Sequence, residues 1–286
     1  SSYKARHLFF RHAICVVMAT ETLDTRATAK QPSRTGMATP HLVLAGYGIS
    51  GALQISVEAQ RILARYGAAY TLGLPANLAA FLKSQRVKVT DITSRIAPGT
   101  DYPESYLDIA NFLIGRTEHE RPGVFLPPGH PLMFNAIGRY LAMEGKRLEL
   151  GVQVVPAVSP LETIIGGIGL DVSTFGRQVF NATRLVARRM PISALVPAVI
   201  MHAGAFGMTA APAAEGTTPD LAPLANYLSM SYPADHAVSV INISERGLGV
   251  ASVALAALPG AAAQLQPGSH LFLDLVRPQQ PMGNPA

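Results

Sequence analysis

Short apolar runs and stretches with helical spacing alternate along residues 41–155. The apolar runs predict strands, and the longer stretches between them, whose apolar positions recur every three to four residues, predict helices. In the stretch 134–144, for example, Ile137, Leu141 and Met143 fall on or near one face. Regular alternation of strand and helix predicts an α/β domain, a sheet flanked by helices. The expected strands are 41–45, 68–72, 87–92, 124–126 and 152–155, and the expected helices are 54–66, 78–83, 104–115 and 134–144.

A second pattern follows residue 155, with more glycine, alanine and proline and less regular alternation. It predicts a second α/β domain with a mixed sheet. Its expected helices are 161–170 and 221–231, and its expected strands are 177–180, 197–202, 237–244, 255–257 and 271–276, with a long loop at 209–223. We therefore expect an N-terminal extension (1–38), an N-terminal domain (39–155), a C-terminal domain (156–279) and a tail (280–286). The extension begins with two serines, as a tag remnant or processed end does, and we expect it to be flexible or to pack on a partner.

Two predicted strands end in loops rich in proline and glycine. The loop 127–131 follows the strand 124–126, and the loop 156–160 follows the strand 152–155. Ligands of open α/β sheets bind just beyond the carboxyl ends of the strands. We therefore expect the functional site at these loops.

A third strand end carries the pattern G-x-G-x-x-G, from Gly46 to Gly51. Strand, glycine-rich turn and helix together form the dinucleotide-binding fingerprint, which also needs an acidic residue at the end of the next strand to hold the ribose. That strand ends in Gly73-Leu74-Pro75, without such a residue. Beside this weakened dinucleotide interpretation, the pattern is also explained by a tight turn alone, since glycines supply positive φ and close approach.

The loop Gly129-His130-Pro131-Leu132-Met133-Phe134, followed by Val155-Pro156-Ala157-Val158-Ser159, resembles the tetrapyrrole (corrin/porphyrin) methylase superfamily. The resemblance extends over about residues 41–278. It implies a two-domain α/β fold, each domain a sheet flanked by helices, with S-adenosylmethionine in a cleft between the domains. It also implies a third interpretation of the glycine-rich loop 46–51, as backbone that comes close to the cofactor and substrate. The residues expected to bind the cofactor or its product S-adenosylhomocysteine are Leu74, Pro75, Pro128, Gly129, His130, Met133, Phe134, Val158, Ser159, Ile243 and Ser244.

Within that superfamily the chain is most similar to the borosin branch, whose members N-methylate backbone amides of a ribosomal peptide. The similarity rests on Gly46–Ile49, on Tyr106, on Gly-His-Pro at 129–131, and on Tyr232-Pro233 followed by Asp235-His236. Three positions depart from that branch: Pro128 replaces a tyrosine, Tyr102 an arginine and His202 a glutamine. No apolar substrate segment follows the second domain, so the resemblance implies a separate peptide.

The methyl acceptor decides which catalytic groups are needed. A tetrapyrrole carbon or an amine nitrogen attacks a sulfonium methyl group with little help, whereas a backbone amide must lose a proton while its carbonyl oxygen is stabilised. The candidate catalytic residues are Tyr106, Tyr102, Tyr47 and His202. His130 is interpreted as a structural loop residue. Three hypotheses remain open: a peptide N-methyltransferase, a methyltransferase for a tetrapyrrole or other small metabolite, and a catalytically degenerate partner subunit that binds the cofactor.

Composition and charge indicate which classes of binding partner to expect. Of the net charge of +5, residues 1–38 contribute +4, so the rest of the chain lacks the basic excess typical of nucleic-acid binding. No apolar run reaches the ~18 residues that a membrane span requires. The single cysteine, Cys15, indicates a reducing, cytoplasmic setting, and the scattered histidines predict no metal site. A hydrophobic content of 49% with 14% charged residues predicts a homodimer.

Overall fold

A computed structural model describes residues 39–117, 119, 122–210, 217–245 and 247–276. The chain divides into a unit of residues 1–40 and a unit of residues 41–286, and the elements named below belong to the second unit. The expectations for the extension 1–38 and for the tail 280–286 lie outside the described residues. No helix among the described residues is long and apolar enough to cross a membrane.

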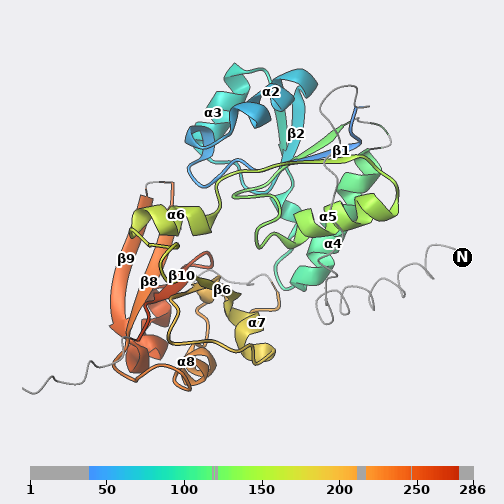
Figure 1. Ribbon diagram of the computed structural model, residues 1–286. Helices are drawn as coiled ribbons and strands as arrows, with labels where there is room; N and C mark the ends of the chain where they lie inside the picture. Colours follow the sequence, from blue (N-terminus) through green and yellow to red (C-terminus); the bar gives the residue numbers. More distant parts are fainter. Residues whose placement is uncertain (1–38, 118, 120–121, 211–216, 246, 277–286) are drawn as a thin grey trace, which may run out of the picture. The chain divides into compact units, whose positions relative to one another are not determined.

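The first sheet has five parallel strands in the order β3-β2-β4-β1-β5 (Figure 1). Two of its three inner strands, β4 and β1, are fully buried, as expected for a sheet covered on both faces. The expected sheet is therefore confirmed, and the structure shows that all of its strands are parallel. The bounds are β1 (Leu42–Ala45), β2 (Ala68–Thr71), β3 (Lys88–Asp91), β4 (Gly123–Leu126) and β5 (Val152–Val155).

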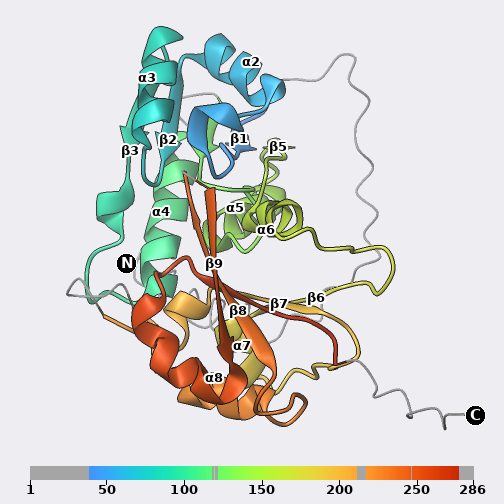
Figure 2. The ribbon, with the colours of Figure 1, turned by 90° about the vertical axis from the view of Figure 1, so that its left-hand side faces the viewer.

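Helices cover both faces of this sheet (Figures 1 and 2). On one face α2 (Val57–Tyr66) and α3 (Ala76–Ser84) pack through Leu63, Leu78 and Leu82. On the other face α4 (Tyr102–Arg116) and α5 (Ala136–Arg147) enclose a separate apolar core. A short 3₁₀ turn, η1 (Gly51–Leu53), precedes α2, and another, η2 (Thr93–Arg95), follows β3.

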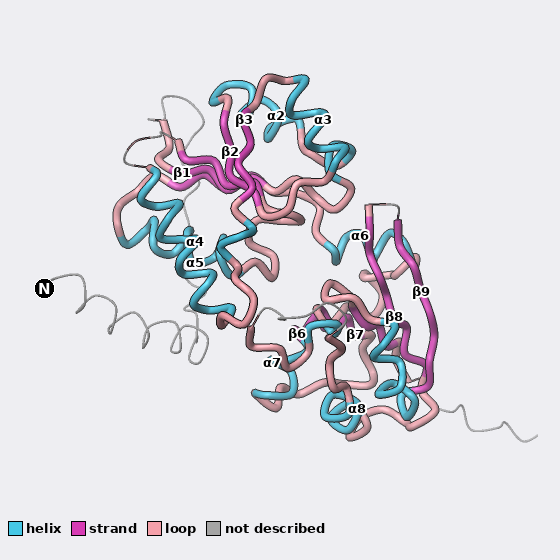
Figure 3. The backbone as a smooth tube through the Cα atoms, turned by 180° about the vertical axis from the view of Figure 1, so that it is seen from behind, coloured by secondary structure: helices cyan, strands magenta, loops and turns pink. Residues whose placement is uncertain are grey.

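The second sheet has the order β6-β7-β10-β8-β9 and is mixed, since β6 and β7 are parallel and the other pairs antiparallel. Figure 3 shows β8 and β9 as a long hairpin. The prediction of a second α/β half with a mixed sheet is confirmed. The bounds are β6 (Gln178–Asn181), β7 (Ala198–Met201), β8 (Ala237–Ser244), β9 (Gly247–Ala254) and β10 (His270–Leu273).

Two different layers cover the second sheet. One core joins α7 (Ala182–Ala187), α8 (Ala222–Leu228) and the 3₁₀ helix η4 (Leu255–Gln264). The other is smaller and holds α6 (Pro160–Gly167), whose buried Ile164 packs on β7 and β8. A further 3₁₀ turn, η3 (Ala203–Ala205), follows β7 directly.

Several predicted elements are wrong in detail. Residues 255–257 are not a strand, because Leu255, Leu258 and Ala261 are buried at a spacing of three, which is the period of a 3₁₀ helix. The helix expected at 134 begins at Ala136, because Phe134 has a left-handed φ of 50°. Met143 is 41% exposed and does not belong to the buried face of α5.

Candidate functional site

The carboxyl ends of the parallel strands of the first sheet lie at one edge, as parallel pairing requires. Four loops leave this strand-end edge: residues 46–50 after β1, 73–75 after β2, 127–134 after β4 and 156–159 after β5. All four carry residues that the sequence places in the site. The topology thus brings together segments that are far apart in the chain.

The glycines of the loop after β1 allow it to contact the loop after β4 through the backbone. The N–H of Gly129 donates to the carbonyl oxygen of Gly48 at 2.9 Å, and the N–H of Tyr47 donates to that of Pro127 at 3.1 Å. A Cβ atom on Gly46 would lie 1.9 Å from the carbonyl oxygen of Gly129. The first glycine of the motif is therefore needed for contact between two loops, which none of the interpretations from the sequence included.

The loop after β2 is held from two sides. Asp91, the last residue of β3, accepts hydrogen bonds from Thr93 at 2.6–2.8 Å and from the N–H of Gly73 at 3.4 Å. Thr93 Oγ1 also accepts from the N–H of Gly73 at 2.7 Å, and the Tyr47 hydroxyl donates to the Gly73 carbonyl at 3.3 Å. Leu74 and Pro75 follow this anchored glycine and are half-buried. The hydrogen bonds of Asp91 and Thr93 to Gly73 were not predicted from the sequence.

Tyr47 lies apart from the other candidate tyrosines. Its ring is buried in the core shared with α2 and α3, whereas Tyr106 packs in the core of α4 and α5 on the opposite face of the sheet. Burial, followed by the negative charges of Glu245 and Asp91, raises the pKa of Tyr47 well above its usual range. The structure therefore gives Tyr47 a role in anchoring Gly73 and does not bring it to the other candidate catalytic side chains.

His130 organises the Gly-His-Pro loop. Its Nδ1 accepts the N–H of Leu132 at 3.1 Å and that of Met133 at 3.2 Å, which caps the turn after Pro131. These bonds agree with the interpretation of His130 as a structural loop residue. They also fix the backbone that leads to Phe134, whose side chain is 36% exposed.

The loop after β5 ends in a capping box. Ser159 Oγ accepts the N–H of Leu161, while Glu162 reaches back to the N–H of Ser159 at 2.8 Å. Desolvation by burial acts to raise the pKa of the Glu162 carboxyl, but the hydrogen bonds from Ser159 outweigh it and lower this pKa. Ser159 is 1% exposed, so its hydroxyl serves the helix, and the half-buried Val158 is the side chain of this pair that remains available to a ligand.

Tyr102 and Tyr106 lie on one face of the first turns of α4, as their spacing predicts. Their rings stack with centroids 5.5 Å apart and an interplanar angle of 24°. The N–H of Tyr102 donates to the carbonyl oxygen of Thr209 at 2.8 Å, so the start of α4 is joined to the segment after η3. Burial, with a smaller effect from Tyr102, raises the pKa of Tyr106 to about 12. Both phenols are protonated at neutral pH and are hydrogen-bond donors.

His202 joins the same region from the end of β7. It has a left-handed backbone (φ 59°, ψ 39°), and its ring meets that of Phe134 edge to face at 5.8 Å. Its backbone N–H donates to Nδ1 of His270 at 3.0 Å, and the two imidazoles lie 5.6 Å apart. Burial lowers the pKa of His202, so this ring is neutral near pH 7. Neither composition nor spacing singled out His270.

Ile243 and Ser244 end β8 at the tip of the hairpin. Ile243 packs beside α6, and the Ser244 hydroxyl donates to the carbonyl oxygen of Gly247 at 3.3 Å. Glu245, the next residue, contributes to the negative field at Tyr47. The tip of the hairpin is therefore electrostatically coupled to the loop after β1.

Pro128, in the loop after β4, is exposed beside the buried Gly129.

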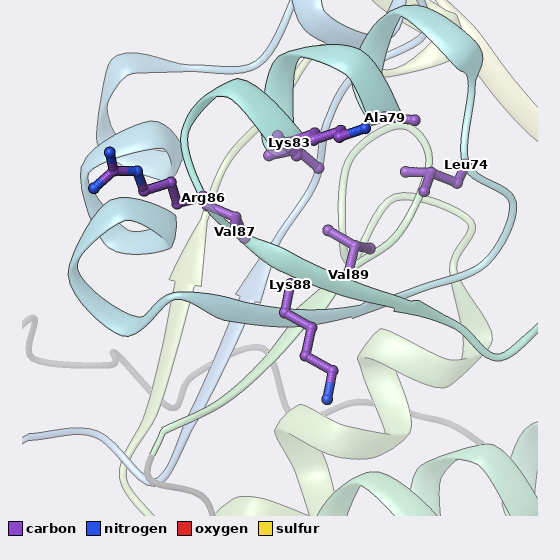
Figure 4. Close-up of a pocket in the computed structure, with 8 residues that line it drawn as sticks. Leu74, Ala79, Lys83, Arg86, Val87, Lys88 and Val89 are labelled. Atoms are coloured by element: carbon purple, nitrogen blue, oxygen red, sulfur yellow. The ribbon is translucent and has the colours of Figure 1, made fainter.

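A shallow hollow of about 370 Å³ lies elsewhere, between α3 and the edge strand β3 (Figure 4). Its lining shares only Leu74 with the predicted site. Figure 4 shows Lys83, Arg86 and Lys88 pointing in different directions, so these cations do not converge on one ligand. We do not assign the site to this hollow. Within the described part of the chain no cluster of three or more acidic, histidine or cysteine side chains could hold a metal ion.

Comparisons with known proteins agree with this fold. The family model described as "Tetrapyrrole (Corrin/Porphyrin) Methylases" matches residues 41–243. A methyltransferase and type I borosin cyclic peptide precursor from Mycena rosella is 24% identical over 177 residues, which are 58% of this chain and 42% of that protein. The chain thus spans less than half the length of this relative.

Two solved structures share the fold. Uroporphyrin-III C-methyltransferase from Thermus thermophilus superposes with a TM-score of 0.58 at 17% identity, over 83% of this chain and 93% of the other. A structure of the same enzyme complexed with S-adenosylhomocysteine gives a TM-score of 0.57 at 15% identity, over 82% and 96%.

Proposed function

The chain belongs to the tetrapyrrole (corrin/porphyrin) methylase family, and from this premise we propose that it N-methylates backbone amides of a separate ribosomal peptide. The broader activity follows from the family: the chain is a methyltransferase that uses S-adenosylmethionine. The peptide acceptor is our proposal. It is supported by the similarity to the borosin enzyme and by the pair of protonated tyrosines at the start of α4.

The strand-end edge fits such a cofactor. At Gly73 no atom lies within 4 Å of the position a Cβ would take, so backbone is open to a ligand there. Leu74, Met133, Val158 and Ile243 offer half-buried apolar surface suited to a purine ring. We propose that the loops 73–75, 128–134 and 158–159, with Ile243-Ser244 from the hairpin, hold S-adenosylmethionine and its product.

The chain's own residues then provide what an amide acceptor needs. When bound, S-adenosylmethionine would supply an electrophilic methyl group for the acceptor nitrogen. In our proposal the Tyr106 hydroxyl donates to the amide carbonyl oxygen, where negative charge develops as the N–H proton leaves. Its pKa of about 12 favours this donor role over that of a base. Stacking on Tyr102 fixes the ring of Tyr106, and Tyr102 stands where the borosin branch has an arginine.

Incubation with S-adenosylmethionine and candidate acceptors tests this function. The acceptors are an unmodified peptide rich in valine and isoleucine, a tetrapyrrole such as uroporphyrinogen III, and a small amine. We expect mass increases of one methylene unit on the peptide, with tandem mass spectrometry placing the methyl groups on backbone nitrogens. Methylation of the tetrapyrrole with none of the peptide would contradict the proposal.

Methylation of a tetrapyrrole is the second candidate, and it is favoured by one observation. The uroporphyrin-III C-methyltransferase fold covers more of this chain than the borosin match does. Binding of S-adenosylhomocysteine without transfer to any acceptor would instead indicate the third hypothesis, a degenerate partner subunit.

We also propose that the protein is a homodimer. Large apolar side chains lie exposed on its surface, with Leu53 84%, Leu195 66% and Met230 70% exposed. The edge strand β9 is mostly exposed and carries no charged residue, which is unusual for the edge of a sheet in a monomer. Light scattering at micromolar concentration tests this proposal, and a monomer mass would contradict it.

A further inference from the structure

A backbone amide acceptor must give up its N–H proton, and the tyrosines at the start of α4 are poor recipients. Tyr106, with its pKa raised to about 12, is protonated at neutral pH, and burial raises the pKa of Tyr102 as well. A side chain near this edge that is unprotonated at neutral pH is a better recipient. His202 is the candidate that the geometry favours.

Two residues with strained backbones, Phe134 and His202, contact each other. Five non-glycine residues of the described chain have positive φ, and two of them, Phe134 and His202, contact each other edge to face at 5.8 Å. Positive φ is unfavourable for residues with a Cβ, and such strain persists where the surrounding structure enforces it, often at functional sites. Phe134 comes from the Gly-His-Pro loop and His202 from the end of β7, so the contact brings His202 beside the loop expected to hold the cofactor.

The backbone around His202 is enforced by the start of β10. Nδ1 of His270, a residue only 2% exposed, accepts the N–H of His202 at 3.0 Å. Two residues later the chain passes so close to residues 266–267 that a Cβ on Gly204 would lie 1.7 Å from the carbonyl oxygen of Gln266. The N–H of Gly204 also donates to the Ser269 carbonyl at 3.3 Å. Residue 202 is thus fixed on both sides.

The His202 ring itself has no hydrogen bond to any described residue, although its backbone does. It is half-buried, and burial lowers its pKa, so the ring is neutral near pH 7. The same burial weakens the ring as a base, so the candidacy of His202 rests on its position beside Phe134 and on a ring nitrogen without a hydrogen bond to a described residue. A nitrogen that needed its lone pair for the fold would have a protein donor, as Nδ1 of His130 and Nδ1 of His270 have.

We propose that His202 accepts the amide proton during methyl transfer, and that His270 is a positioning residue that holds His202 against Phe134. The proton transfer to His202 rests on the proposed peptide substrate. The positioning of His202 by His270 does not depend on the substrate. In the step, the N–H bonding pair becomes available to form the N–CH₃ bond, the proton moves to a ring nitrogen of His202, and sulfur keeps the pair of the broken bond. His202 then returns the proton to solvent.

Two substitutions of His270 separate positioning from packing. His270→Asn keeps an acceptor atom near the place of Nδ1, whereas His270→Leu keeps apolar volume and removes the acceptor. His41→Leu is the matched control, since Nδ1 of His41 also accepts a backbone N–H, that of Gly151, at 3.0 Å but at the opposite end of the strands.

With the peptide acceptor we expect His270→Leu to lower kcat about 10- to 100-fold, because a misplaced catalytic group costs up to about 10²-fold. The KM for the peptide and the Kd for S-adenosylhomocysteine should stay within about threefold. His270→Asn should restore kcat to within a few-fold, and His41→Leu should leave it unchanged. Wild-type kcat in His270→Leu, or an equal loss in His270→Asn, would overturn the proposal.

A second readout needs no substrate. Long-range ¹H–¹⁵N spectra of the histidine rings report which nitrogen carries the proton. In the wild type, Nδ1 of His270 should be unprotonated, and the ring signals of His202 should shift in His270→Leu but not in His270→Asn. If the wild type methylates no peptide, the proposed function fails while this spectrum still tests the positioning. Unchanged His202 signals in His270→Leu would refute it.

Discussion

The contact between the loops after β1 and β4 is tight enough for one methyl group to disturb it. In Gly46→Ala the new Cβ would lie 1.9 Å from the Gly129 carbonyl oxygen and 2.9 Å from the Ala157 side chain. A tolerable carbon–oxygen contact is about 3.3 Å, so the loops must separate by about 1.4 Å. Such a shift would break the hydrogen bonds between Gly129 and Gly48 and between Tyr47 and Pro127.

The expected loss of stability in Gly46→Ala is the cost of the steric overlap plus the loss of these two hydrogen bonds. Overpacking costs about 1–3 kcal/mol, and two backbone hydrogen bonds contribute about 1 kcal/mol each, so the free energy of unfolding should fall by about 3–5 kcal/mol. Gly67→Ala is the control, because Gly67 also has a positive φ of 72° but no atom within 4 Å of a Cβ. It should lose only about 1–2 kcal/mol.

Urea unfolding followed by far-UV circular dichroism measures both variants, since the chain has no tryptophan. Calorimetry on the folded protein should also show weaker binding of S-adenosylhomocysteine to Gly46→Ala than to Gly67→Ala. If Gly46→Ala unfolded within 1 kcal/mol of Gly67→Ala and bound the product equally well, the two loops would not depend on each other as described.

Three further substitutions test separate parts of the site. Tyr106→Phe keeps the stacked ring and should lower methyl transfer to a peptide about 10²–10³-fold, with unchanged binding of S-adenosylhomocysteine. Turnover within several-fold of wild type would remove Tyr106 from the mechanism. Tyr102→Phe is the control. Ser159→Ala removes the capping box of α6 and should reduce the free energy of unfolding by about 1 kcal/mol, and an unchanged urea midpoint would argue against the cap. His130→Leu leaves the N–H groups of Leu132 and Met133 without their acceptor. It should clearly weaken the binding of S-adenosylhomocysteine while the melting temperature changes little. A large fall in melting temperature with unchanged binding would indicate that the loop has only a structural role.

The sequence predicted regular elements well where side chains alternate clearly. The alternating strand 237–244 is confirmed residue for residue as β8. Its partner β9 was missed, because Gly247, Gly249 and the small residues after them carry little strand propensity and are held by pairing with β8. The short helix α7 was also missed, since six residues give too little periodicity to recognise.

The site could be predicted in part. Motifs located the strand-end loops, and the i, i+4 spacing placed Tyr102 and Tyr106 together. The contacts that fix these loops could not be predicted, because they depend on backbone atoms and on distant residues. Gly46 against Gly129 and His270 against His202 are contacts between segments about 70 to 80 residues apart.

Calorimetric titration of S-adenosylhomocysteine into the purified, folded protein tests directly whether the loops at the strand-end edge hold the cofactor. We expect saturable binding at one site per chain, weakened in Gly46→Ala. A correctly folded protein that releases no binding heat at any temperature tested, and whose melting temperature the product does not raise, would contradict it.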